Sequence, residues 1–196
     1  MKDIRLIDCL HRVYNFSTDI PYLFKTLRFD SILRHVVMWL SYYVLPAYYY
    51  LTNKLYMLDV EPNNTYITDR RIIVSLTSFP RRIGVVWQTI ESLFRQTIKP
   101  DKIILWLSNE QFSSFNDLPK ELQAQTERGL EIRFVDGDFR SHKKYLYAFQ
   151  EFPHDYVVLV DDDILYPSNF INQLMDGMSA TRVHCSYGSI ITFDKL

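Results

Sequence analysis

Between residues 71 and 160 the chain alternates short apolar runs with amphipathic stretches, and this alternation restricts the fold more than any other feature of the sequence. Runs rich in Ile, Val and Leu are typical of strands buried on both faces, while apolar residues repeating every three to four positions indicate helices. The expected strands are RIIVSL (71–76), KIILWL (102–107), LEIRFV (130–135) and YVVLV (156–160). The expected helices lie within residues 82–97, 118–129 and 141–152. This order predicts an α/β fold with a doubly wound, mostly parallel sheet and right-handed crossovers.

Residues 1–60 differ in composition from the rest, because they contain 12 of the 30 aromatic residues. IRLIDCLHRVY (4–14) carries a helical apolar stripe, and no charged residue lies between Arg34 and Lys54. Pro46 is expected to interrupt the second helical stretch. Three interpretations of this segment stay open: packing against the α/β domain or an oligomer partner, an anchor lying in a membrane interface, and a membrane span.

The sequence therefore divides into an aromatic-rich helical segment (1–60), a polar linker (61–70) and an α/β domain (71–196). Lys and Arg number 22 against 23 Asp and Glu, so no basic field indicates a nucleic-acid partner. The two cysteines lie far apart in sequence, which favours neither a disulfide framework nor a metal knuckle and fits a reducing cytoplasm.

Three consecutive carboxylates, Asp161 to Asp163, directly follow the last expected strand. Neighbouring like charges repel, so a cation is expected among them. If the strand continues, its period of two places Asp161 and Asp163 on one side and Asp162 on the other. Carboxylate oxygens favour Mg²⁺ or Mn²⁺, with substrate phosphates completing the coordination shell. The alternative is an acidic solvated loop, or Asp163 as the N-cap of a helix beginning near Pro167.

The segments IIVSLTSFPRRI, QTIKPDKIILWLS and DDDILYP, in this order within βα units, resemble the nucleotide-sugar half of GT-A glycosyltransferases. The resemblance covers about residues 72–185 and is to bacterial enzymes of the family-two type, which assemble surface polysaccharides and lipopolysaccharides. It implies that Asp163 binds the metal directly, that Asp161 lies near the ribose and the metal's water shell, and that Asp162 is the variable middle position of the donor site.

The resemblance also implies further donor-binding residues. The loop after the first strand would hold the base and ribose, the segment after the second strand would read the base, and cations before the helix at 141–152 would bind phosphate. These residues are Thr77, Ser78, Phe79, Pro80 and Arg82, then Asn109 or Glu110, then Lys143 or Lys144. For Phe79 the alternative is ordinary loop packing, and for the lysine pair it is a solvated helix face.

The activity implied is metal-dependent transfer of a sugar, with Mn²⁺ or Mg²⁺, from a nucleotide-sugar to a polysaccharide or lipid-linked acceptor. The expected location is cytoplasmic, peripheral at the inner membrane face. The resembled family places its catalytic base after a fifth strand, so we assign no catalytic residue and expect the chain to be truncated at its C-terminus; the alternative is an acceptor site completed by another chain. Two alternatives remain: a metal-dependent nucleotidyltransferase or hydrolase, which the lack of a Gly-rich phosphate loop disfavours, and a non-catalytic nucleotide-binding or assembly remnant.

Overall fold

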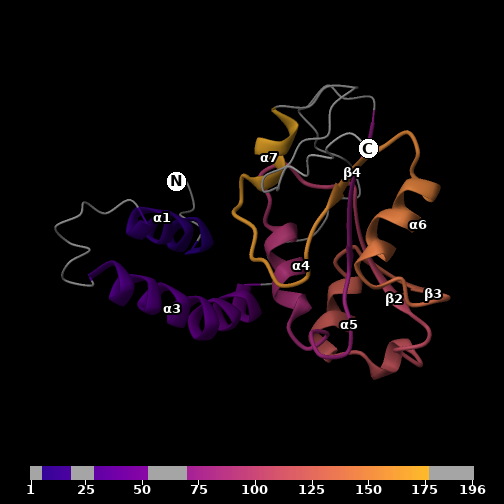
Figure 1. Ribbon diagram of the computed structural model, residues 1–196, viewed down its shortest axis with the longest axis horizontal. Coiled ribbons are helices and arrows are strands. Elements are labelled where there is room, and N and C mark those ends of the chain that lie inside the picture. The colour runs from indigo at the N-terminus through magenta and orange to yellow at the C-terminus, as the bar shows by residue number, and fades with distance from the viewer. Residues whose placement is uncertain (1–5, 19–28, 53–69, 177–196) are drawn as a thin grey trace, which may run out of the picture.

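Four parallel strands form the centre of the α/β domain (Figure 1). The computed structural model describes residues 6–18, 29–52 and 70–176. The sheet has the order β3-β2-β1-β4, and each neighbouring pair is parallel. The strands are β1 (Ile72–Thr77), β2 (Lys102–Ser108), β3 (Leu130–Val135) and β4 (Tyr156–Leu159). The predicted doubly wound parallel sheet is confirmed.

Helices cover both faces of this sheet because successive strand residues point to opposite sides. Val74 and Leu76 pack with α4 (Val86–Phe94), α5 (Lys120–Thr126) and α7 (Phe170–Met175), whereas Ile73 belongs to a smaller cluster on the face where α6 (Lys143–Glu151) lies (Figure 1). Both Val74 and Ile73 are fully buried. Full burial of an aliphatic side chain stabilises the fold by about 1.5–3 kcal/mol.

Two further helices, α1 (Leu6–Thr18) and α3 (Phe29–Thr52), pack against each other beside the α/β domain (Figure 1). Their shared cluster of buried residues is Ile7, Leu10, Val37, Leu45 and Tyr49. Trp87 of α4 and Leu165 pack against that cluster, so the inner side of the helix pair continues into the α/β domain. No helix in the described parts of the chain has the length and apolarity needed to cross a bilayer.

The expectation that Pro46 interrupts the second helix is wrong, because α3 is helical on both sides of it. A proline inside a helix removes one backbone hydrogen bond and costs about 3 kcal/mol. Leu45 and Tyr49, one on each side of Pro46, are almost completely buried. Their packing offsets that cost and keeps the turn helical.

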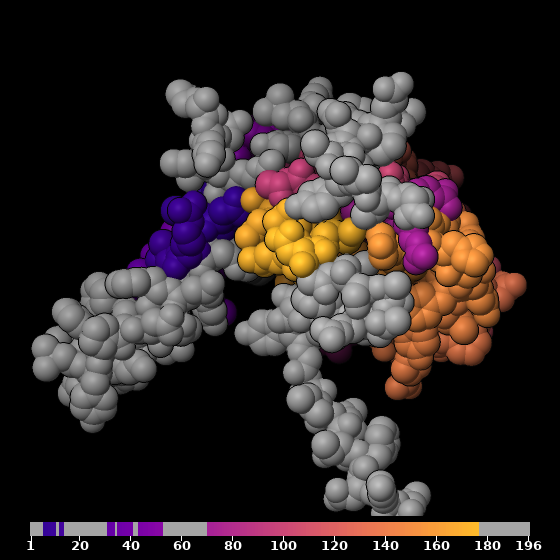
Figure 2. Space-filling model, turned by 90° about the horizontal axis from the view of Figure 1, so that it is seen from above, coloured from indigo at the N-terminus to yellow at the C-terminus, as the bar shows by residue number. Residues whose placement is uncertain are grey.

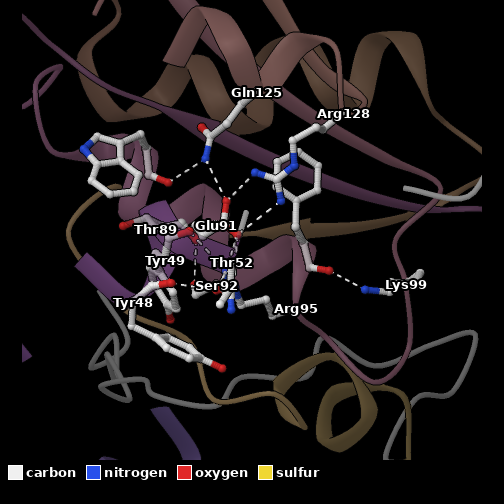
Figure 3. Close-up of polar contacts among 12 residues, drawn as sticks. Tyr48, Tyr49, Thr52, Thr89, Glu91, Ser92, Arg95, Lys99, Gln125 and Arg128 are labelled. Atoms are coloured by element: carbon white, nitrogen blue, oxygen red, sulfur yellow. Dashed lines mark hydrogen bonds and ion pairs between the residues drawn. The ribbon is translucent and has the colours of Figure 1, made fainter. Parts of the chain in front are cut away.

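A buried ion cluster ties α3 to α4 and α5 (Figure 3). Glu91 accepts hydrogen bonds from Arg95 Nε at 3.0 Å and from Arg128 Nη1 at 2.6 Å, and all three residues are buried. Arg95 also donates to Thr52 Oγ1 at 2.8 Å, and its guanidinium lies over the Tyr49 ring at 4.4 Å. One carboxylate therefore holds two guanidinium groups at the junction of three helices.

Candidate functional site

The loop after β1 meets the end of β4 through Asp162. Asp162 is buried, with 7% of its surface exposed. Its carboxylate accepts hydrogen bonds from Ser78 Oγ at 2.7 Å and Arg82 Nη1 at 2.9 Å, and its carbonyl accepts one from Thr89 Oγ1 at 3.0 Å. Asp162 is thus the residue that joins β4, the β1 loop and α4.

Asp161 and Asp163 point outward on either side of this buried residue. Burial alternates from Val160 to Asp163, although β4 ends at Leu159 and residues 162–163 lie in a turn. Lys144 donates to Asp161 at 2.6 Å, and Arg82 lies 2.9 Å from Asp163. The hydrogen bond to Asp162 raises the pKa of Arg82, so its charge persists at any physiological pH. Two side-chain cations therefore offset part of the charge of the three carboxylates.

The remaining β1-loop residues form a tight turn at the same edge of the sheet. The backbone N–H groups of Arg82 and Ile83 donate to the Phe79 carbonyl, and the Arg82 guanidinium lies 5.4 Å from the centre of the Phe79 ring. The Phe79 ring is partly exposed and Pro80 is exposed, so both are accessible to a ligand. Thr77 Oγ1 instead donates to the Trp106 carbonyl at 2.8 Å, inside the sheet.

A second polar group lies at the ends of β2 and β3. Asn109 Nδ2 donates to Asp136 at 2.8 Å, and Lys143 Nζ donates to Asp138 at 2.5 Å. The Lys143 hydrogen bond lowers the pKa of Asp138 below its usual value. Glu110 is exposed, whereas Lys143 is buried. The two neighbouring lysines thus contact different carboxylates, and only Lys144 contacts the triple aspartate.

Three residues that the sequence did not single out hold the triple-aspartate segment in place. Tyr166 Oη accepts a hydrogen bond from the Asp161 backbone N–H at 2.9 Å, and burial raises the pKa of Tyr166 to about 12. Ser168 donates to Asp8 of α1 from its backbone N–H at 2.8 Å and from Oγ at 2.5 Å. Figure 2 shows α1 directly beside α7, the helix that follows Ser168. No local pattern could have revealed a contact between residues 8 and 168.

The comparison with known families now decides the class of the protein. The model of a family described as glycosyl transferase family 2 matches residues 77–195, which is more than half of the chain. The chain belongs to glycosyl transferase family 2. No curated protein and no solved structure matches it.

Membership of glycosyl transferase family 2 makes this chain a glycosyltransferase with a GT-A fold, as the sequence predicted. The family also implies a nucleotide-sugar donor and an acceptor. The site described above lies outside the carboxyl ends of the parallel strands, where open α/β sheets bind their ligands. Residues 177–196, where the expected truncation and any later catalytic base would fall, lie outside the described residues.

The outward carboxylates of the glycosyltransferase suit a divalent ion that is shared with a substrate. Among the described residues, no group of three or more His, Cys, Asp or Glu side chains is arranged to hold a metal by itself. Mg²⁺ in nucleotide sites is usually held by one or two carboxylates together with substrate phosphates. Asp161 and Asp163 are two exposed carboxylates of the kind that such an ion takes, and in the structure they contact Lys144 and Arg82.

Proposed function

We propose that this glycosyltransferase uses Mn²⁺ or Mg²⁺ to transfer a sugar from a nucleotide-sugar to a polysaccharide or lipid-linked acceptor. The observation that carries the proposal is the meeting of three carboxylates from the end of β4 with Arg82 and Lys144 at one edge of the sheet. The carboxylates can bind a divalent ion, and the two cations can bind the phosphate groups that the ion bridges to the protein.

Each residue of the cluster has a separate part in donor binding. Asp161 and Asp163 would hold the ion, which when bound supplies positive charge to the departing nucleoside diphosphate. The Arg82 guanidinium, 42% exposed, binds a phosphate oxygen while its contact with buried Asp162 fixes its position. Lys144 supplies a second positive charge next to Asp161. The exposed Phe79 ring stacks on the base or ribose.

The donor's diphosphate leaves as negative charge develops on it, and residues fixed before the reaction stabilise that charge without reorganising. Arg82 meets this requirement because two carboxylates and the Phe79 ring hold its guanidinium. Asn109, whose side chain donates to Asp136 at the ends of β2 and β3, would contact the base. The proposed cellular setting is the cytoplasmic face of a bacterial inner membrane, in the assembly of a surface polysaccharide.

Calorimetric binding of nucleoside diphosphates and nucleotide-sugars, with and without Mn²⁺, tests this proposal directly. We expect one nucleotide to bind only with the ion, and Asp163→Ala to weaken binding at least about a hundredfold, since it removes a direct ionic ligand. Glu121→Ala, an exposed carboxylate on α5, is the matched control and should bind as the original chain does.

Two results would contradict the proposal. Metal-independent binding of equal strength to both variants would remove the ion from the mechanism. Release of pyrophosphate from a nucleoside triphosphate, without any requirement for a sugar, would assign the cluster to nucleotidyl transfer instead.

A further inference from the structure

Helix α3 presents a continuous apolar face away from the rest of the protein. The members of this outward face recur at helical spacing and are all exposed: Ile32, Val36, Trp39, Tyr43 and Tyr50. Trp39 is 57% and Tyr50 63% exposed, and the Trp39 and Tyr43 rings lie 5.4 Å apart. At its N-terminal half the face is hollowed by an open depression of about 400 Å³ lined by Ser31, Ile32, His35, Val36 and Trp39.

The opposite side of α3 is already covered, so the outward face is not part of the protein's core. Val37, Leu45 and Tyr49 are buried against α1 and the α/β domain. A helix at the surface of a soluble domain normally turns charged and polar residues to the solvent. Here both sides are apolar, and a contiguous exposed apolar surface of this kind marks an interaction site.

The residue types on the outward face indicate a lipid surface as its partner. Trp and Tyr are the side chains that favour the boundary between lipid headgroups and hydrocarbon, and three of the five residues on this face are of these types. No Asp, Glu, Lys or Arg occurs between Arg34 and Lys54, so the helix brings no formal charge into the headgroup region over that length.

Residues 1–60 carry a small excess of positive charge, which favours an anionic surface. Residues 1–60 contain seven Lys and Arg against five Asp and Glu, whereas residues 61–196 contain 15 against 18. Basic residues near an anionic leaflet each contribute about 1 kcal/mol of attraction. We propose that the outward face of α3 docks, parallel to the surface, on a bilayer that contains anionic lipids.

Docking would fix the position of the donor site relative to the lipid. Helix α3 is joined to α4 by the hydrogen bond from Arg95 to Thr52, and α1 is joined to the triple-aspartate segment by the hydrogen bonds from Ser168 to Asp8. These contacts hold the docked helix and the crevice as one unit. A lipid-linked acceptor could then reach the crevice from the membrane, and this consequence rests on the proposed function. The docking of α3 does not depend on the proposed function.

Flotation of the full chain with vesicles tests the docking. We expect the chain to float with vesicles of phosphatidylcholine and phosphatidylglycerol, and less with phosphatidylcholine alone. Ile32→Gln/Trp39→Gln should reduce binding at least about tenfold, because each side chain loses its transfer into an apolar environment. The matched control is Tyr145→Gln/Phe149→Gln, which removes two exposed aromatic residues of α6 and should float as the original chain does.

Tryptophan fluorescence gives a second readout, which uses the original chain and so does not require a variant to fold. Trp39 is strongly exposed, Trp106 is buried and Trp87 is partly buried. Vesicles should therefore shift the emission to shorter wavelength through Trp39. Trp39→Phe should abolish the shift while flotation continues, since the face stays apolar.

The outcomes separate this proposal from others. Unchanged flotation of the Ile32→Gln/Trp39→Gln variant would overturn it. So would a chain that does not float but forms a dimer that the same substitutions dissociate, because the face would then bind a second copy. Ion-dependent nucleotide binding of this variant should match that of the original chain, so failure of docking is distinguishable from failure of the proposed function.

Discussion

At the residue scale, the three neighbouring aspartates differ because the chain turns after β4 and buries only the middle one. Asp162 points inward to Ser78 and Arg82, whereas Asp161 and Asp163 point outward. The sequence predicted this alternation from the strand period, but it placed a metal ion as the expected positive charge. In the structure Arg82 and Lys144 contact these carboxylates, and the metal ion stays a prediction.

Substitution of the inner aspartate should mainly lower stability, whereas substitution of an outer aspartate should mainly abolish ion-dependent binding. Asp162→Asn should lower the free energy of unfolding by about 1–3 kcal/mol, because it weakens a buried, charge-assisted hydrogen-bond pair. Asp163→Asn, at a half-exposed position, should change stability by no more than about 0.5 kcal/mol yet abolish Mn²⁺-dependent nucleotide binding. Urea unfolding and calorimetry measure the two effects. Equal stability losses in both variants would refute this division of roles.

Tyr166 should make stability depend on alkaline pH. Its pKa is raised from 10.0 to about 12, so its contribution is complete below pH 10 and is lost as the pH rises from 10 towards 12. Tyr166→Phe should cost about 1 kcal/mol at pH 7 by removing the hydrogen bond to the Asp161 backbone. This deficit should shrink above pH 10, as followed by urea unfolding. The stability of the surface variant Tyr145→Phe should follow that of the original chain across this pH range. A Tyr166→Phe deficit that stays constant above pH 10 would contradict the predicted pH dependence.

At the scale of elements, the sequence predicted best where one periodicity determined the structure. The strand at 130–135 was predicted with its observed bounds, because apolar residues alternate with charged ones there and a glycine precedes the segment. Helix α4 is shorter than its apolar pattern, since residues 82–85 form the turn that carries Arg82. The path of α3 through Pro46 was missed because its stability comes from tertiary packing. For the same reason the contact between Asp8 and Ser168 has no signal in either segment.

The link between α1 and the triple-aspartate segment should support donor binding. Asp8→Ala should cost about 1–3 kcal/mol of stability, because the buried Ser168 N–H loses its acceptor. It should also weaken Mn²⁺-dependent nucleotide binding, while Asp8→Asn, whose amide oxygen still accepts one hydrogen bond, should restore part of it. Cys9→Ser, the exposed neighbour on α1, is the control. Unaltered binding by a folded Asp8→Ala chain would show that the link is structural only.

The stability contributed at the start of α6 should fall at acidic pH, because it depends on the ionised Asp138. Its pKa is lowered from 3.8 by the hydrogen bond from Lys143, so the stability it contributes is present above pH 4 and is lost as the pH falls through the folded-state pKa. Asp138→Asn should therefore be less stable than the original chain at pH 7, and the two should converge below pH 3.8. Thermal unfolding across this range measures the effect. A gap that stays constant down to the lowest pH would contradict it.

At the scale of the whole molecule, one buried carboxylate contributes to the junction between the N-terminal helices and the α/β domain. Glu91 holds Arg95 and Arg128, and Arg95 reaches Thr52 of α3 (Figure 3). Both guanidinium groups are buried beside the Glu91 carboxylate, and removing one partner of such a buried ion pair is strongly destabilising. The proposed docking surface on α3 therefore keeps its position relative to the donor site through this cluster.

Glu91→Gln should destabilise α3 more than the sheet. Removing one partner of a buried ion pair costs about 3–5 kcal/mol, because the remaining charge stays desolvated. Urea unfolding should show this loss, and hydrogen exchange should speed up in α3 more than in β1, since α3 loses its anchor while β1 keeps its neighbours β2 and β4. Glu121→Gln, exposed on α5, should change stability by no more than about 0.5 kcal/mol. If exchange rises equally in α3 and β1, the cluster stabilises the protein as a whole and does not act as the joint between its two parts.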